Sequence, residues 1–328
     1  MLILDQDRLS FRFPEVHEDA VLNVEFQRTL RIPDDNREYA LPPGLGRFPL
    51  THVDDFAERL PAPWTQHGGV FLPMYQAEAL WLYFRTHCSY PFAIKIAAGK
   101  IDAITGGAWS TELSDEPQNY VVAPTQPWLD GFCVSKGVIR QFVAMPLGEG
   151  FTAEEQLTGQ AEHGGLQIIA YPMKAEIYEE ILAEDEAYRG TELKFSNRPN
   201  HQVMEMGLAP GGRMRQSIYD DPHGMDVWDQ DHSSRCFVHI LNSLQYAQVT
   251  GHEPPTQPPT VTDYTEAGLP WFDYYDAEAI ALEGAAKLAG LDSVASLGAK
   301  KGLPPLPGNT PIEPKVIQTI KPIREGDF

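Results

Sequence analysis

The sequence predicts a β-dominated α+β protein, in which antiparallel sheets form a sandwich or barrel-like body accompanied by a few short helices. Bulky residues recur at every second position in several short runs, as expected for strands. Glycine pairs that begin at Gly68, Gly106, Gly164 and Gly211 separate these runs and favour turns. The 28 prolines and 27 glycines of the chain are spread along it, which limits the length of its helices.

The clearest strands lie in the first half of the chain. Residues 90–96 alternate bulky and small or charged side chains, the pattern of a half-buried strand. After a turn at residues 97–100 the alternation resumes at residues 101–105, so we expect a hairpin. Short apolar runs at residues 138–147 and 166–171 predict two more strands.

A second hairpin is predicted after residue 205. Residues 213–219 alternate, and residues 235–242 are apolar on both faces, which is typical of a buried strand. His239 and Cys236 lie in this second run and are therefore expected to be core residues. The segment at residues 207–212 is rich in glycine and is predicted to be the turn that enters the hairpin.

A few helices are also predicted. Each begins after a residue that can cap it or carries apolar residues on one face. The expected helices cover residues 52–60, 175–188, 277–289 and 293–301. Residues 74–84 fit a helix or a buried strand equally well, since their apolar residues have helical spacing but include many aromatic side chains.

The length of 328 residues suggests roughly two domains. We expect a β-rich N-terminal domain at residues 1–200, and a β-hairpin region with an acidic loop at residues 201–250 that packs on the same body. A Pro-rich connection at residues 251–270 leads to a helical appendage at residues 271–302. Residues 303–328 form an extended Pro-rich tail, in which Val316, Ile317 and Ile320 are able to pair as an edge strand.

Composition excludes several classes of protein. The formal net charge is −21, with 46 acidic against 25 basic residues, so the surface repels phosphate backbones and no nucleic acid partner is expected. No apolar stretch approaches the roughly 18 residues of a membrane span, and the N-terminus lacks the basic region of a secretory signal. The three cysteines are far apart and odd in number, which favours reduced thiols and a cytoplasmic location.

Known cofactor and nucleophile motifs do not assemble in this sequence. Residues 148–153 match G-x-G-x-x-A, but Gly159 interrupts the following helix and Glu149 places a negative charge where a pyrophosphate would bind. We therefore interpret the segment as a strand–turn connection and expect no nucleotide cofactor. His87 and Cys88 are adjacent, and on a strand they would point to opposite faces, which excludes them as a nucleophile pair.

The densest group of reactive side chains lies at residues 220–232, with five carboxylates and two imidazoles and no Lys or Arg between Arg215 and Arg235. Carboxylates this close repel one another, and a divalent metal ion would relieve the repulsion. The predicted ligands of that ion are His223, Asp226, Asp229, Asp231 and His232. The simpler interpretation of the same segment is a solvated acidic loop between two strands, and the last alternative is a catalytic acid–base pair.

Five sequence blocks resemble a family of uncharacterised proteins found in bacteria and fungi. They are residues 27–35 (QRTLRIPDD), 41–46 (LPPGLG), 140–148 (RQFVAMPLG), 206–214 (MGLAPGGRM) and 270–275 (PWFDYY). The resemblance spans most of the chain, so we expect a whole family member and not a fusion. No activity is established for the family, and the resemblance therefore implies no catalytic residues. Some members are labelled membrane proteins, which disagrees with the absence of a spanning segment here.

These observations leave two main functional hypotheses. The first is a soluble, β-rich binding or assembly protein without catalysis, whose strand edges would allow a homo-oligomer. The second is a metal-dependent, hydrolase-like enzyme that uses the acidic loop at residues 220–232. A third, a binder of cationic partners, is suggested by the net charge alone. The sequence identifies neither a catalytic residue nor a small-molecule ligand.

Overall fold

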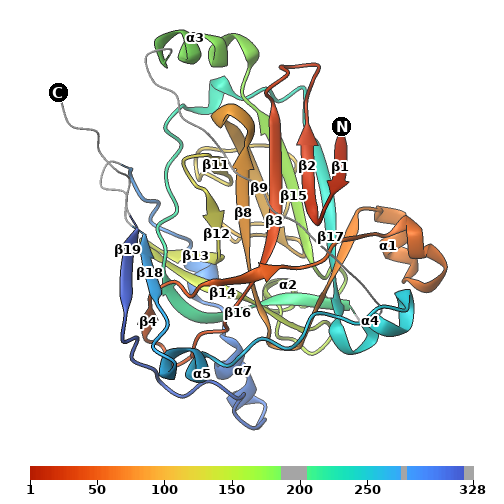
Figure 1. The fold of residues 1–328 in the computed structure, drawn as a ribbon, viewed down its shortest axis with the longest axis vertical. Coiled ribbons are helices and arrows are strands. Elements are labelled where there is room, and N and C mark those ends of the chain that lie inside the picture. Colours follow the sequence, from red (N-terminus) through yellow and green to blue (C-terminus); the bar gives the residue numbers. More distant parts are fainter. Residues whose placement is uncertain (186–204, 275–278, 321–328) are drawn as a thin grey trace.

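The structure is a computed structural model that describes residues 1–185, 205–274 and 279–320. It is β-dominated, with one large and mostly antiparallel sheet and few helices (Figure 1), which confirms the predicted fold class. Within the described residues the large sheet contains 17 strands, and β18 and β19 form a small second sheet. Three pairings, β4–β16, β7–β17 and β18–β19, are parallel.

The strands are distributed along the whole described chain. Those of the first 110 residues are β1 (Leu2–Asp5), β2 (Arg8–Arg12), β3 (Val21–Thr29), β4 (Glu38–Tyr39), β5 (Gly44–Arg47), β6 (Thr51–His52), β7 (Val70–Met74), β8 (Ala79–Thr86), β9 (Phe92–Ala98) and β10 (Ile101–Asp102). Those that follow are β11 (Val121–Ala123), β12 (Trp128–Leu129), β13 (Gly131–Ser135), β14 (Val138–Pro146), β15 (Leu166–Pro172), β16 (Glu205–Arg215), β17 (Ser234–Asn242), β18 (Trp271–Tyr274) and β19 (Ile317–Ile320).

The helices are short and lie around the sheet. They are α1 (Ala62–His67), α2 (Ala153–Thr158), α3 (Ala175–Asp185), α4 (Ser243–Thr250), α5 (Val261–Glu266), α6 (Ala286–Ala289) and α7 (Val294–Lys300), with 3-10 helices η1 (Asp54–Arg59), η2 (His87–Ser89) and η3 (Met225–Val227). In Figure 1, α1 and α4 lie together on one side of the sheet, whereas β18 and β19 lie on the other. None of the helices within the described residues is long and apolar enough to cross a membrane.

The predicted hairpin at residues 90–105 is present as β9 and β10, with Ile101 opposite Ala98. All of β9 is buried, however, and not only one face. The second face is covered by the following loop, because Lys95 Nζ donates hydrogen bonds to Ser110 Oγ and to the Glu112 carbonyl. The alternating pattern therefore predicts the strand correctly. It also predicts a strand buried on one face, whereas both faces of β9 are buried.

The prediction of a turn at residues 207–212 is wrong, since this segment is the centre of β16. Its glycines serve close packing instead of chain reversal. A Cβ at Gly211 would lie 2.5 Å from Val143 Cγ2, and one at Gly212 would lie 2.5 Å from the Pro33 carbonyl oxygen. A neighbouring side chain and a neighbouring backbone carbonyl thus approach β16 at a distance that favours glycine. The strand prediction for residues 235–242 is confirmed by β17.

The helix predicted at residues 277–289 is also largely wrong, and residues 277 and 278 lie outside the described part. Only α6 is helical there. Upstream, Ile280 and Leu282 form backbone hydrogen bonds with Asp220 and Ile218, so pairing with a distant segment overrides local helix propensity. Gly284, with φ of +78°, then ends this extended stretch.

The remaining predictions for helices have mixed outcomes. The predicted helix at residues 52–60 is replaced by β6 and η1, and α7 confirms the one at residues 293–301. The helix predicted at residues 175–188 appears as α3, and its last three residues lie outside the described part. The ambiguous segment 74–84 contributes to β8.

The core predictions at β17 are confirmed. His239 is 7% exposed and Cys236 is 3% exposed. His239 Nε2 lies 3.1 Å from the Gly68 carbonyl oxygen, and burial lowers the pKa of His239 to about 4. The imidazole is therefore neutral and satisfied inside the protein at neutral pH, which is a structural role.

Candidate functional site

The acidic loop predicted as a metal site connects β16 to β17 and is folded by its own side chains. Asp221 accepts hydrogen bonds from Tyr120 Oη at 2.7 Å, from Trp228 Nε1 at 2.8 Å and from the His223 backbone N–H at 2.8 Å. This carboxylate thus organises the loop against a buried tyrosine and tryptophan.

The side chains of two of the five predicted ligands, Asp229 and His232, contact each other within this loop. Asp229 Oδ2 lies 2.9 Å from His232 Nδ1, and this contact raises the pKa of His232. His223 packs edge-on against Trp228, and burial lowers the pKa of His223. The Asp226 carbonyl accepts a hydrogen bond from Lys174 Nζ, while Asp231 donates its backbone N–H to Asp229. Among the described residues, ligand-type atoms of three side chains come within 4.8 Å of one another at Asp19, His87 and Cys88, outside this loop.

A more enclosed site lies between the turn that joins β7 to β8 and two segments from the end of the described chain. A cavity of about 280 Å³ is lined there by Arg31, the residues of the turn and two proline-rich stretches. A second cavity of about 230 Å³ lies beside it and is lined by apolar side chains that include Met145, Phe151 and Leu303. Gln76 and Leu306 line both cavities, which therefore adjoin.

A buried ion pair supports the first cavity. Arg28 on β3 donates two hydrogen bonds to Glu78 Oε1, from Nε at 2.8 Å and from Nη2 at 2.6 Å. Glu78 Oε2 accepts the Tyr75 backbone N–H at 2.9 Å. Both charged side chains are less than 9% exposed. Burial raises the pKa of Glu78, and the Arg28 guanidinium opposes that shift.

Arg31 supplies the positive charge at the cavity wall, just beyond the end of β3. Its Nη1 donates to Asn309 Oδ1 at 2.6 Å, and its Nη2 donates to the Pro307 carbonyl. Both acceptors are neutral. Burial lowers the pKa of Arg31 and the nearby Asp34 opposes the shift, but a guanidinium stays charged at all physiological pH values.

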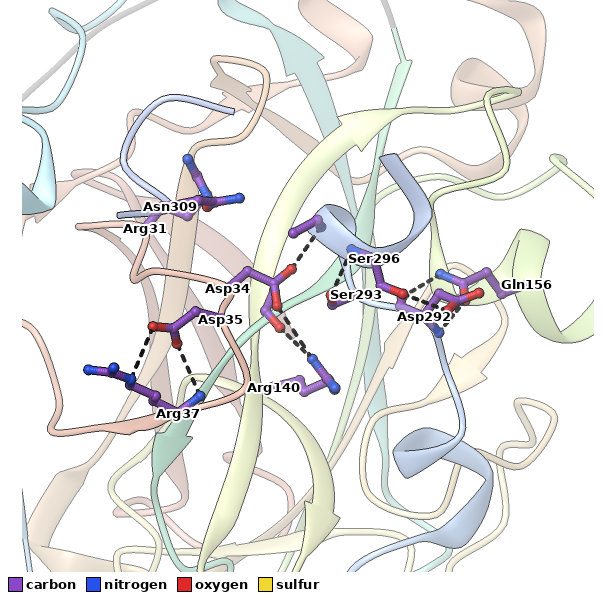
Figure 2. A network of polar contacts seen from close by, with 12 residues as sticks. Arg31, Asp34, Asp35, Arg37, Arg140, Gln156, Asp292, Ser293, Ser296 and Asn309 are labelled. Atoms are coloured by element: carbon purple, nitrogen blue, oxygen red, sulfur yellow. Dashed lines mark hydrogen bonds and ion pairs between the residues drawn. The ribbon is translucent and has the colours of Figure 1, made fainter. Parts of the chain in front are cut away.

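A network of polar contacts, drawn in Figure 2, attaches the α7 segment beside this site. Asp34 Oδ2 accepts the Ala295 backbone N–H at 2.8 Å, and Asp34 Oδ1 lies 3.8 Å from Arg140 Nη1. Gln156 forms two hydrogen bonds with the backbone of Asp292, the residue before the N-cap of α7. The wall of the apolar cavity is therefore held in place by side chains from two distant segments, Asp34 after β3 and Gln156 in α2.

A larger cavity of about 650 Å³ lies on another part of the molecule and includes Cys133 and the Gly284 turn in its lining. Burial raises the pKa of the Cys133 thiol to about 12. The thiol is therefore protonated at neutral pH and is a poor nucleophile.

The comparisons with known proteins gave no match, whether with family models, with curated proteins or with solved structures. The resemblance to a bacterial and fungal family stays a prediction. The site must accordingly be interpreted from its own geometry. Sequence reasoning missed Arg31 and Glu78, because their partners are distant in the chain and neither belongs to a spaced motif.

Proposed function

We propose that the protein binds a small organic anion, with the anionic group held by Arg31 in the 280 Å³ cavity. The observation that carries this proposal is an arginine that lines a cavity and has neutral acceptors as its hydrogen-bond partners. A guanidinium has five N–H donors, so further donors remain for a carboxylate. Arg28 and Glu78 neutralise each other. The carboxylate that acts on the charge of Arg31 is that of Asp34, which lies 3.8 Å from Arg140 and is shared with it.

The neighbouring cavity supports an apolar portion in the same ligand. Its lining includes Met145, Phe151, Val294 and Leu303, and Leu306 lines both this cavity and the Arg31 cavity. Binding sites for small molecules are typically mostly apolar with a few polar groups that fix orientation. A carboxylate with a short alkyl chain has both features, and octanoate is a suitable probe.

Arg31→Gln is expected to weaken octanoate binding by roughly 10–100-fold, because a hydrogen bond to a charged group contributes about 1.5–3 kcal/mol. The measurement is isothermal titration calorimetry on the whole chain, with 1-octanol as the uncharged probe. The wild-type protein should prefer octanoate to octanol, and Arg31→Gln should abolish the preference.

Two variants control for indirect effects. Asn309→Ala removes one partner of Arg31 but keeps the charge, so it should retain the preference for octanoate. Arg213→Gln removes a half-buried arginine that pairs with Glu38 at 2.8 Å and lies outside the cavity lining, and this variant should bind octanoate as the wild type does. Equal octanoate affinity in Arg31→Gln and wild type would contradict the proposal, as would a wild-type protein that binds none of acetate, hexanoate and octanoate.

A further inference from the structure

A group of metal-ligating side chains lies at the opposite end of β3 from Arg31, where β3 begins and β8 ends. These strands are antiparallel neighbours, with Leu22 opposite Thr86. Asp19 precedes β3, and His87 and Cys88 follow β8 in η2. The sheet register therefore brings residues separated by almost 70 positions in the chain to one edge.

The side chains converge more closely than the sequence predicted. His87 and Cys88 would point to opposite faces of a strand, but Cys88 has φ of +46° and ψ of +31° within η2. Both side chains consequently reach Asp19, and one ligand atom from each of the three residues lies within 4.8 Å of the others. Asp19 Oδ1 is 3.3 Å from His87 Nε2. The assumption that His87 and Cys88 lie on a strand was thus wrong, because β8 ends at Thr86.

The backbone that carries these ligands is held by surrounding aromatic residues. The Asp19 backbone N–H donates to His17 Nδ1 at 3.0 Å. Tyr178 Oη donates to the Cys88 carbonyl at 3.1 Å, and the Tyr90 N–H donates to the His87 carbonyl at 2.8 Å. The rings of His17, Tyr90 and Tyr178 pack against one another, with centroids 4.1–5.5 Å apart. Such outer contacts orient metal ligands in known sites.

We propose that Asp19, His87 and Cys88 bind one divalent transition metal ion, with Zn²⁺ the best match. Thiolate, imidazole and carboxylate are the three ligand types that Zn²⁺ accepts, and in a tetrahedral site they lie roughly 3–4 Å apart. Ca²⁺ and Mg²⁺ instead require oxygen ligands. As the zinc–sulfur bond forms, the Cys88 thiol releases its proton to solvent.

Three protein ligands leave one position of a tetrahedral ion for water or a small ligand. Access from solvent is available, because the His87 side chain is 54% exposed and Cys88 is exposed. The proposed centre is therefore of the open type and not the closed four-ligand type that serves only to stabilise a fold. It is also independent of the anion site proposed at Arg31.

The test uses the purified whole chain and Zn²⁺ alone as the probe. Calorimetry and elemental analysis after desalting should give one zinc per chain. His87→Gln and Cys88→Ser should each weaken binding by more than the roughly 10–100-fold that loss of an outer-shell partner costs. Loading with Co²⁺ should produce a sulfur-to-metal charge-transfer band in the wild type that is absent from Cys88→Ser.

His232→Gln is the matched control, since His232 is also an exposed histidine that contacts an aspartate, at 2.9 Å. It should bind zinc as the wild type does, and circular dichroism should show that all variants are folded. Zinc lost in His232→Gln but retained in His87→Gln would overturn the proposal and locate the ion in the acidic loop. A folded wild-type protein with no stoichiometric zinc would overturn both assignments.

Discussion

Glu78→Gln is expected to lower the free energy of unfolding by about 3–5 kcal/mol, the cost of leaving a buried charge without its partner. The substitution conserves volume and retains a side-chain oxygen for the Tyr75 N–H, so it isolates the loss of charge beside Arg28. Both residues are buried, with exposures of 3% for Glu78 and 8% for Arg28. Urea denaturation followed by circular dichroism measures the change.

The matched control is Glu38→Gln, which breaks an ion pair with Arg213 of similar length, 2.8 Å, between two side chains that are 41% and 32% exposed. Exposed pairs contribute about 0–1 kcal/mol, so this variant should remain close to the wild type. The double variant Arg28→Met with Glu78→Leu should recover most of the stability, because apolar replacements of both partners are tolerated. Similar losses in Glu78→Gln and Glu38→Gln would refute the importance of burial at this pair.

Asp130→Asn is expected to stabilise the protein above pH 7 and to flatten the dependence of its stability on pH. Asp130 is 4% exposed, and its Oδ2 accepts a hydrogen bond from Gln216 Nε2 at 2.8 Å. Burial raises the pKa of Asp130 to about 7, and the Gln216 hydrogen bond opposes the shift. The folded protein therefore retains a proton that the unfolded chain releases near pH 4.

The sign of the effect follows from this difference in bound protons. Between about pH 4 and pH 7 the folded state binds more protons than the unfolded state, so the free energy of unfolding falls as pH rises. The free energy of unfolding falls by at most about 4 kcal/mol over this range, because the pKa of Asp130 rises from 3.8 to about 7 on folding and one pKa unit corresponds to about 1.4 kcal/mol. Asparagine carries no charge at any of these pH values. The variant should therefore equal the wild type near pH 4 and exceed it at pH 8.

Urea titrations at intervals between pH 4 and pH 8 measure this profile. In Asp130→Asn the slope of the free energy of unfolding against pH should be reduced but not abolished, because burial also raises the pKa of Glu154 to about 7. Asp55→Asn, at an exposed position, should leave the profile of the wild type unchanged. Parallel profiles for Asp130→Asn and wild type would show that Asp130 titrates in the folded protein as it does in the unfolded chain.

The sequence predicts those parts of the fold that depend on local pattern. β9, β14, β15 and β17 follow alternating or continuously apolar runs, and α7 follows a capping signal. The errors occur where a distant segment determines the backbone. Gly211 and Gly212 resemble turn residues until the proximity of Val143 and Pro33 is known, and residues 280–282 resemble a helix until their pairing with Ile218 and Asp220 is known.

The candidate sites differ in the same way. The acidic loop stands out in the sequence because its charges are neighbours in the chain, and the structure shows an aspartate there, Asp221, engaged in folding the loop. Arg31 and Glu78 carry no local signal in the sequence. Glu78 pairs with Arg28, which is 50 positions away, and Arg31 contacts Asn309, which is 278 positions away. Asp19 and His87 meet only through the register of β3 and β8.

The contact between Arg31 and Asn309 has a consequence for biosynthesis. Their separation of 278 positions means that a ribosome has made nearly all of the described chain before the wall of the cavity at Arg31 can close. Contacts so remote in sequence form slowly in folding, and until then the arginine and the apolar residues beside it remain uncovered on the nascent protein. A chaperone that recognises such surfaces could therefore bind this region until the segment around Asn309 covers it.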